Sequence, residues 1–339
     1  MSLPARHPAH LELRPDIKKW VEVDASLAIK LNEWTEIKGI FLRLESEVQP
    51  PLGYYKINNG EIDTLFMKIL KQEDIESQLQ ADRIARWLNN RGVKTNYLME
   101  ESPRLFSSNL AALIYPYLDG RYALHTVSDM GLLGASLASL HQQLHTCPWQ
   151  SEIKIQGNER QKRLTSLLNQ LKKRLPDNTE IPYEVISLIV TDVEQDLLDV
   201  LTDQSQVVHG DLNYGNVLFN QAGTEITFLD FEDTGMAWFS SLMELSYALE
   251  RFSFTDDDEQ TLALSRCVYQ AYTENGGAGY QYESQLSDIL RALSIRALLL
   301  LIMVCQSGRW TVPESEWKKF LMLYQQAVNR KPLLSKVMH

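Results

Sequence analysis

Two short apolar runs, each leading into polar residues, carry the most informative chemistry in this sequence. The first leads to His209-Gly210-Asp211, with Asn216 five residues after Asp211, and the second, Thr227-Phe228-Leu229, leads to Asp230. A hairpin made of the two runs can present two carboxylates and one carboxamide to one cleft. Phosphoryl transfer needs such a set, because Mg²⁺ takes oxygen ligands from side chains and nucleotide phosphates, and a separate carboxylate orients the attacking hydroxyl and accepts its proton.

A plain surface hairpin is the alternative, because Asp and Asn are common turn residues. In that case Asp211 and Asn216 would have no chemical role. The alternative explains neither their spacing nor the second motif around Asp230, so we expect a phosphoryl-transfer site.

With these motifs the sequence resembles the aminoglycoside phosphotransferase and choline kinase-like family, whose members are relatives of the protein kinases. His209-Gly210-Asp211 with Asn216 is similar to the family's catalytic loop, and Leu229-Asp230-Phe231-Glu232 is similar to the metal-binding segment that replaces DFG. The resemblance implies that Asp211 is the catalytic base or orienting carboxylate and that Asn216 and Asp230 hold magnesium. It makes His209 a structural residue that braces the metal segment. Glu232 either reaches a second metal or a water, or is a solvated acid.

A strand-like run upstream contains the candidate phosphate ligand. Thr64–Leu70 puts Lys68 on the same face as Phe66 and Leu70, where a charge is costly without a partner. The resemblance implies that Lys68 binds the α- and β-phosphates of ATP. A surface lysine whose stem covers apolar residues is the alternative. Lys56 also lies in a strand-like run, but it precedes the hairpin turn and fits less well.

The sequence departs from the family at two places near Lys68. Family members carry a helix glutamate that pairs with this lysine, but the aligned residue here is Ala81. We expect either Gln80 or Glu76 to take its place, and the sequence does not decide between them. The glycine-rich phosphate loop is also reduced to Gly39 and Gly53, so the backbone cradle for phosphates is expected to be weak or differently built.

A segment between the two halves of the chain, Leu113–Gly120, resembles the family's hinge. The resemblance implies that backbone groups here bind the adenine edge, with the carbonyl of Pro116 as acceptor and the N–H of Leu118 as donor. The expected nucleotide is ATP, with GTP not excluded. The alternative is a simple turn from a strand into a helix.

Hydrophobic patterning places these residues in two different kinds of structure. The first part is strand-rich around one helix, with a hairpin turn at Asn58-Asn59-Gly60; strands are expected over residues 36–42, 54–57, 64–70 and 109–115 and the helix over residues 73–90. After Asp119-Gly120 the pattern is mainly helical, apart from short β-like runs in residues 207–231. A first helix capped by Ser128 starts this part, and prolines 176 and 182 interrupt the helical patterns of residues 157–203.

This order is unlike alternating βαβ units, so we predict an α+β, bilobal protein-kinase-like fold with a small strand-rich N-lobe and a larger, mainly helical C-lobe. The expected divisions are a loosely ordered extension at 1–30, a nucleotide-binding N-lobe at 31–118, and a C-lobe at 119–339 that carries the catalytic loop and acceptor site. The aromatic residues from Trp238 to Phe254 are interpreted as a core stripe. Binding of a cationic acceptor by these aromatic residues and by Asp256–Glu259 is the alternative.

Composition limits the partners. With 33 Lys and Arg against 44 Asp and Glu, the 339-residue chain has a formal charge of −11, which argues against nucleic acid and anionic membranes and favours a neutral or cationic small molecule. Three widely spaced cysteines indicate neither a disulfide framework nor a zinc site, so a reducing cytoplasm is expected. The most apolar run, Ala297–Cys305, is far shorter than the roughly 20 residues that span a bilayer.

Together these features predict an enzyme that transfers the γ-phosphoryl of ATP to a hydroxyl of a small polar molecule: an aminoglycoside, an amino alcohol, a sugar or a homoserine-like compound. A protein Ser/Thr kinase is the first alternative, although no activation loop of protein-kinase length separates Asp230 from the helix near Met243. A catalytically silent nucleotide-binding module is the second. The sequence does not decide the acceptor or the oligomeric state.

Overall fold

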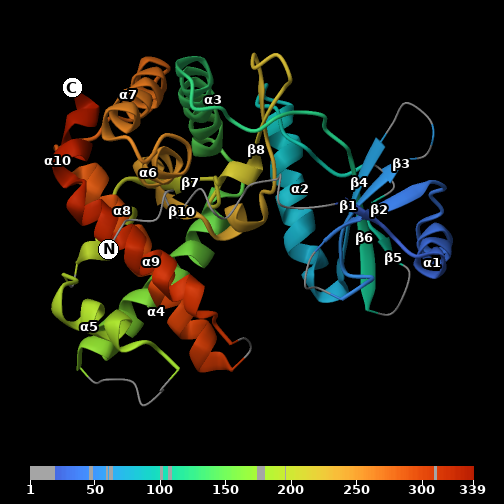
Figure 1. Cartoon of the computed structure of the whole chain (residues 1–339), viewed down its shortest axis with the longest axis horizontal. Coiled ribbons are helices and arrows are strands. Elements are labelled where there is room, and N and C mark those ends of the chain that lie inside the picture. Colours follow the sequence, from blue (N-terminus) through green and yellow to red (C-terminus); the bar gives the residue numbers. More distant parts are fainter. Residues whose placement is uncertain are drawn as a thin grey trace. The chain divides into compact units, whose positions relative to one another are not determined.

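The computed structural model describes residues 20–339 apart from 46–48, 59, 61–63, 100–101, 106–108, 174–179, 195 and 309–310. Its elements belong to two units (Figure 1). We call residues 20–122 with 215–235 the sheet unit, and residues 123–214 with 236–339 the helical unit. The short segment 215–235 therefore folds with the strand-rich part of the chain, although it follows almost a hundred residues of the helical part.

One antiparallel sheet with the strand order β1-β2-β3-β4-β6-β5 forms the sheet unit. Its strands are β1 (Trp20–Glu22), β2 (Ile40–Leu44), β3 (Gly53–Asn58), β4 (Thr64–Lys71), β5 (Arg104–Leu105) and β6 (Leu110–Pro116). The strands expected over residues 54–57, 64–70 and 109–115 are confirmed. Asn59 of the expected hairpin turn lies outside the described residues.

The first expected strand begins four residues later than predicted. Residues Ala25–Thr35 form helix α1, whose N-cap Asp24 accepts a hydrogen bond from the amide of Leu27. Glu36 ends this helix with a left-handed backbone (φ 56°), so the chain turns there and enters β2 only at Ile40. Residues 20–30, which we expected in an extension, thus form β1 and part of α1.

Alternation along β3 and β4 separates a core face from a half-exposed face. Tyr55, Ile57, Met67 and Ile69 are buried together with Leu31 of α1. Their neighbours along the strands point to the other face of the sheet, as the period of two requires; these are Tyr54, Lys56, Phe66 and Lys68. Helix α2 (Ile75–Asn89) follows a short 3₁₀ turn, η2 (Gln72–Asp74), and confirms the helix expected over residues 73–90.

A β-hairpin completes the sheet unit. Its strands β8 (Val217–Phe219) and β9 (Ile226–Phe228) are antiparallel, and the turn between them is closed by Asn220, whose side-chain oxygen accepts from the amide of Thr224 at 2.9 Å. Thr95 pairs with Phe228 and Arg121 pairs with Phe219 through isolated bridges. The two bridges attach the hairpin to the segment between α2 and β5 and to the segment after β6.

The helical unit consists mainly of helices, as predicted. These are α3 (Val127–His145), α4 (Gln150–Lys173), α5 (Tyr183–Thr191), α6 (Ser241–Phe252), α7 (Asp258–Glu274), α8 (Gln285–Ser307), α9 (Glu314–Asn329) and α10 (Lys331–Leu334). Two short strands, β7 (Ser205–Val207) and β10 (Trp238–Ser240), pair antiparallel, and the remaining elements are the short 3₁₀ turns η3 (Leu197–Leu201) and η6 (Ser335–Met338). Pro182 immediately precedes α5, and Pro176 lies outside the described residues.

Helix α3 begins two residues earlier than expected. Its cap is Thr126, whose hydroxyl accepts from the amide of Asp129, so the predicted cap, Ser128, lies inside the first turn. A Cβ at Gly134 would lie 2.2 Å from the carbonyl oxygen of Val268, and glycine is therefore what allows α3 and α7 to approach so closely. Phe239, Phe252 and Phe254 are buried, in agreement with the core interpretation, whereas Trp238 and Tyr247 are only half-buried. The apolar run Ala297–Cys305 lies inside α8, and among the described residues we find no helical segment that could span a bilayer.

Candidate active site

Asp211 lies in a loop of the helical unit that leaves strand β7. The amide of Val208 donates to the carbonyl of Ala237 at 3.1 Å, which extends the β7–β10 pairing to the start of this loop. The Oδ2 atom of Asp211 accepts from the Asn213 carboxamide at 2.8 Å, and Oδ1 accepts from the Tyr247 hydroxyl at 3.2 Å. Both oxygens of the carboxylate are thus held by neighbouring side chains. Sequence reasoning missed both donors, and Tyr247 gives no local signal because it belongs to α6.

A buried glutamate anchors the same loop. Glu244 of α6 is 1% exposed, and its carboxylate accepts from the amides of His209 at 3.0 Å and Gly210 at 2.6 Å. Gly210 has a φ of 91°, a left-handed conformation that glycine adopts without strain. The ionised side chain of Glu244 therefore fixes the backbone just before Asp211. Sequence reasoning also missed Glu244.

A histidine supports this anchor. The Nε2 atom of His141 lies 2.9 Å from Glu244, and its Nδ1 atom lies 2.7 Å from the hydroxyl of Tyr272. Burial opposes the ionisation of Glu244, but the hydrogen bond and charge of His141, with the contributions of His209 and the Gly210 amide, hold its pKa below the usual value. His209 itself is fully buried, and the Asp211 amide donates to its Nδ1 atom at 3.4 Å. Its predicted contact with the metal segment stays a prediction.

The two candidate magnesium ligands lie at one end of the hairpin in the sheet unit. Asn216 comes directly before β8, Asp230 follows β9 by two residues, and the Leu229 amide donates to the Asn216 carbonyl at 2.9 Å. Asp230 has a left-handed backbone with φ 59°, which turns the chain where the strand pairing ends. An amide oxygen and a carboxylate are hard donors of the kind that magnesium takes beside nucleotide phosphates, so the pair fits a magnesium–nucleotide complex. In the described part of the chain no three His, Cys, Asp or Glu side chains cluster to hold a metal.

Lys68 lies in the middle of β4, and its ammonium forms an ion pair with Glu232. It also lies 3.3 Å from the Gln78 carboxamide oxygen and 5.7 Å from the centre of the Tyr54 ring. Burial lowers the pKa of Lys68, and the negative charge of Asp230 opposes this effect. The two charged groups are therefore close enough to influence each other within the sheet unit.

The expected helix partners of Lys68 were wrong. Glu76 is exposed and Gln80 is only half-buried, whereas Gln78 is 4% exposed and contacts the lysine. Gln78 precedes Ala81 by three residues, so the two share a helix face. The buried face of α2 lies at a slightly different helical phase from the one that we inferred.

The hinge residues Pro116 and Leu118 lie where β6 ends. Pro116 pairs with Leu65 of β4, and its carbonyl accepts from the Asn96 carboxamide at 3.2 Å. A carbonyl has two lone pairs, so this oxygen can accept a second donor. Lys56 lies nearby, with its ammonium 4.1 Å from the centre of the Tyr117 ring. The adenine contacts of Pro116 and Leu118 stay predictions.

The expected phosphate loop connects β2 to β3, and its residues 46–48 lie outside the described chain. Gly53 ends the loop with a φ of 128°. Arg43 of β2 donates to the carbonyl of Leu52 at 3.1 Å, so the described part of the loop is held by side chains of the sheet.

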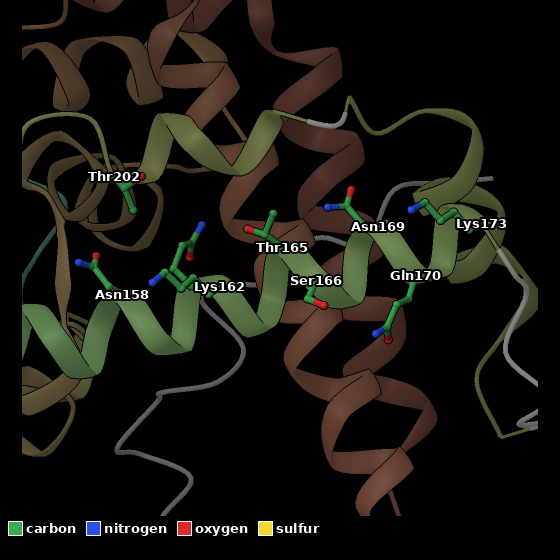
Figure 2. A pocket seen from close by; sticks show the side chains of 9 residues that line it. Asn158, Lys162, Thr165, Ser166, Asn169, Gln170, Lys173 and Thr202 are labelled. Carbon is green, nitrogen blue, oxygen red and sulfur yellow. The ribbon is translucent and has the colours of Figure 1, made fainter.

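A polar groove of about 540 Å³ lies elsewhere on the helical unit, along α4 and beside Thr202 (Figure 2). Amide, hydroxyl and lysine side chains line it: Asn158, Gln161, Lys162, Thr165, Ser166, Asn169, Gln170, Lys173 and Thr202. None of the candidate catalytic, nucleotide or metal residues belongs to this groove.

Comparison with known proteins finds a matching family and solved structures of similar fold. The family described as the phosphotransferase enzyme family matches residues 54–274, which include every candidate site residue. A macrolide 2'-phosphotransferase type I is 15% identical, with a TM-score of 0.58 over 89% of this chain and 98% of that one. A spectinomycin phosphotransferase in complex with ADP and spectinomycin is 14% identical, with a TM-score of 0.56 over 93% of this chain and 98% of that one.

A microcompartment-associated aminopropanol kinase is 16% identical, with a TM-score of 0.52 over 93% of this chain and 99% of that one. No curated protein matches the sequence. These likenesses confirm the predicted bilobal protein-kinase-like fold with its strand-rich and helical lobes.

Proposed function

Because the chain belongs to the phosphotransferase enzyme family, we propose that it transfers the γ-phosphoryl group of ATP, with Mg²⁺, to a hydroxyl of a small polar molecule. Membership of this family bears out the expected phosphotransferase class. The observation that best supports the specific reaction is the carboxylate of Asp211, held on both oxygens by Asn213 and Tyr247. A carboxylate with a fixed direction is what a hydroxyl acceptor needs for alignment and proton transfer.

Asp211 orients the acceptor hydroxyl and takes its proton as the oxygen attacks. Glu244 keeps the loop in place through the His209 and Gly210 amides, so little reorganisation accompanies the reaction. Magnesium, when bound, neutralises charge on the transferred phosphoryl group. Asn216 and Asp230 are the residues that would hold it.

Lys68 binds the nucleotide phosphates, and the backbone of Pro116 and Leu118 binds the base. The nucleotide is ATP, with GTP as the alternative. The ADP in the related spectinomycin phosphotransferase supports nucleotide use by this fold.

The acceptor is a small neutral or cationic molecule with a free hydroxyl. The net charge of −11 disfavours an anionic one. The names of the relatives, which refer to macrolides, spectinomycin and aminopropanol, support antibiotics and amino alcohols as the first classes to examine. Only residues 231–240 separate Asp230 from helix α6, which is too short for a protein-kinase activation loop and disfavours a protein substrate.

A screen of acceptors tests this function. Aminoglycosides, macrolides, amino alcohols, sugars and homoserine are incubated with the protein, Mg²⁺ and ATP or GTP, and nucleoside diphosphate release is measured against the Asp211→Asn variant. We expect release that depends on one class of acceptor and is lost in the variant. Nucleotide binding without turnover of any acceptor would indicate a silent module, and the absence of both binding and turnover would contradict the proposal.

A further inference from the structure

The ammonium of Lys68 has an unusual set of neighbours within the sheet unit. Its side chain is 16% exposed, and a charge so little solvated is costly unless an opposite charge lies close. Among its described contacts, Glu232 supplies the carboxylate, Gln78 a neutral carboxamide and Tyr54 a ring face. Asp230 and Asp74 act on it electrostatically.

Helix α2 presents no carboxylate to this lysine. Its residue in contact is Gln78, and Ala81 is buried on the same face. Asp82, the next acidic residue, has other partners: it accepts from Arg86 Nε and from the Leu98 amide, both at 2.6 Å. The acid that pairs with Lys68 therefore comes from a different part of the chain.

Glu232 lies in the segment that carries the candidate metal ligand. It is the first residue of a 3₁₀ turn (η5, Glu232–Met236), two residues after Asp230. Asp230 reverses the backbone with φ 59° after β9, and Glu232 then contacts β4. One ion pair thus joins the strand with the phosphate-binding lysine to the segment with the metal-binding aspartate.

We propose that Glu232 is the structural counter-ion of Lys68 and that, with Gln78, it positions the ammonium for the nucleotide phosphates. The role attributed to Lys68 rests on the proposed function. Glu232 then acts as a positioning residue: its ion pair fixes the Lys68 ammonium on β4 relative to the segment that contains Asp230. This assigns Glu232 a role distinct from metal ligation and from that of a solvated acid.

A double-mutant cycle tests the ion pair without nucleotide. Melting temperatures are measured for wild type, Lys68→Met, Glu232→Gln and the double variant, with Glu76→Gln as control because it removes an equal charge from an exposed position of α2. We expect each single variant to have a lower melting temperature than wild type. The decrease in the double variant should be smaller than the sum of the two single decreases. Additive losses would overturn the pairing. This result does not depend on whether the protein is a phosphotransferase.

Nucleotide binding tests the positioning role. ADP affinity is measured by calorimetry with EDTA and then with Mg²⁺. We expect Glu232→Gln to weaken ADP binding about 3- to 30-fold in both buffers, and we expect Gln78→Glu in the same chain to restore most of it, since this places a carboxylate beside Lys68 from the helix side.

Three results would overturn the positioning role. A loss seen only with Mg²⁺ and not rescued by Gln78→Glu would make Glu232 a metal ligand. An unchanged ADP affinity of Glu232→Gln would mean that Glu232 does not influence nucleotide binding. Tighter binding would mean that Glu232 competes with phosphate for the lysine. If wild type itself binds no nucleotide, the proposed function fails, whereas the melting cycle still decides the ion pair.

Discussion

The hydroxyl of Tyr247 donates a hydrogen bond of 3.2 Å to the Oδ1 atom of Asp211, which connects helix α6 with the candidate catalytic loop. The same helix carries Glu244, which anchors the loop backbone. One helix therefore fixes both the backbone and the carboxylate orientation at this position.

Removal of the Tyr247 hydroxyl should slow turnover without a change in nucleotide affinity. Tyr247→Phe keeps the ring and removes one hydrogen bond to the carboxylate, so we expect kcat to fall about 2- to 12-fold. Steady-state kinetics with the best acceptor would measure this. Tyr183→Phe, at a highly exposed position of α5, serves as the control. Equal kcat values for wild type and Tyr247→Phe would mean that the hydrogen bond has no catalytic consequence.

Substitution of the candidate base should separate turnover from binding. Asp211→Asn keeps the shape of the side chain but removes the charge that accepts the proton, and we expect turnover to fall about 10²- to 10⁴-fold. Nucleotide affinity should stay close to that of wild type. Asp203→Asn, on an exposed turn after η3, is the matched control. Near-normal turnover of Asp211→Asn would show that the catalytic loop is misassigned.

Substitution of the candidate metal ligand Asp230 should affect nucleotide binding as well as turnover. Asp230→Asn removes a charged oxygen ligand from a hard cation, so both turnover and magnesium-dependent nucleotide affinity should fall. Calorimetric titrations of ADP with and without Mg²⁺ would reveal the difference. If the variant and wild type gained equal affinity from magnesium, Asp230 would have no part in metal binding.

Two lysines on the same face of the sheet should contribute unequally. Lys68→Ala removes the little-exposed ammonium that interacts electrostatically with Asp230, and we expect weaker nucleotide binding and lower turnover. The ammonium of Lys56 lies over the Tyr117 ring, and we expect Lys56→Ala to change nucleotide affinity and turnover little. Nucleotide affinities of both variants measure the contrast. Equal losses would mean that the phosphate-binding strand is wrongly assigned.

The buried anchor Glu244 should make the free energy of unfolding depend on pH in the acidic range. Its folded-state pKa is lower than the unfolded value of about 4.3, so the stability that it contributes is present above that value and is lost as pH falls through the folded pKa. Glu244→Gln removes hydrogen bonds of an ionised acceptor and should lower the free energy of unfolding by about 1.5–3 kcal/mol at pH 7.

The difference between Glu244→Gln and wild type should shrink in acid. Urea unfolding at pH 7 and pH 4 would measure it, with Glu184→Gln, an exposed residue of α5, as the control. A constant difference at both pH values would contradict the assignment of an ionised anchor.

The sequence alone predicted the secondary structure of the sheet unit well. The strand-like runs 54–57 and 64–70 and the helical period in 73–90 correspond to β3, β4 and α2, because short runs rich in apolar and aromatic residues favour strands and burial of one helix face imposes a local period. Boundaries were less accurate. Helix α1 and its end at Glu36 were missed, and Thr126 rather than Ser128 caps α3, since a cap depends on backbone geometry at a single residue.

Asp211, Asn216 and Asp230 could be singled out as candidates from sequence, because their residue types and spacing belong to one short segment. Their supporting residues could not. Tyr247 and Glu244 reach the catalytic loop from α6, and Glu232 reaches Lys68 across 164 positions of the chain. The sequence by itself therefore determined which groups could perform the chemistry. Only the tertiary structure decided which side chains hold them, because such contacts follow from how distant segments pack and have no local spacing that reveals them.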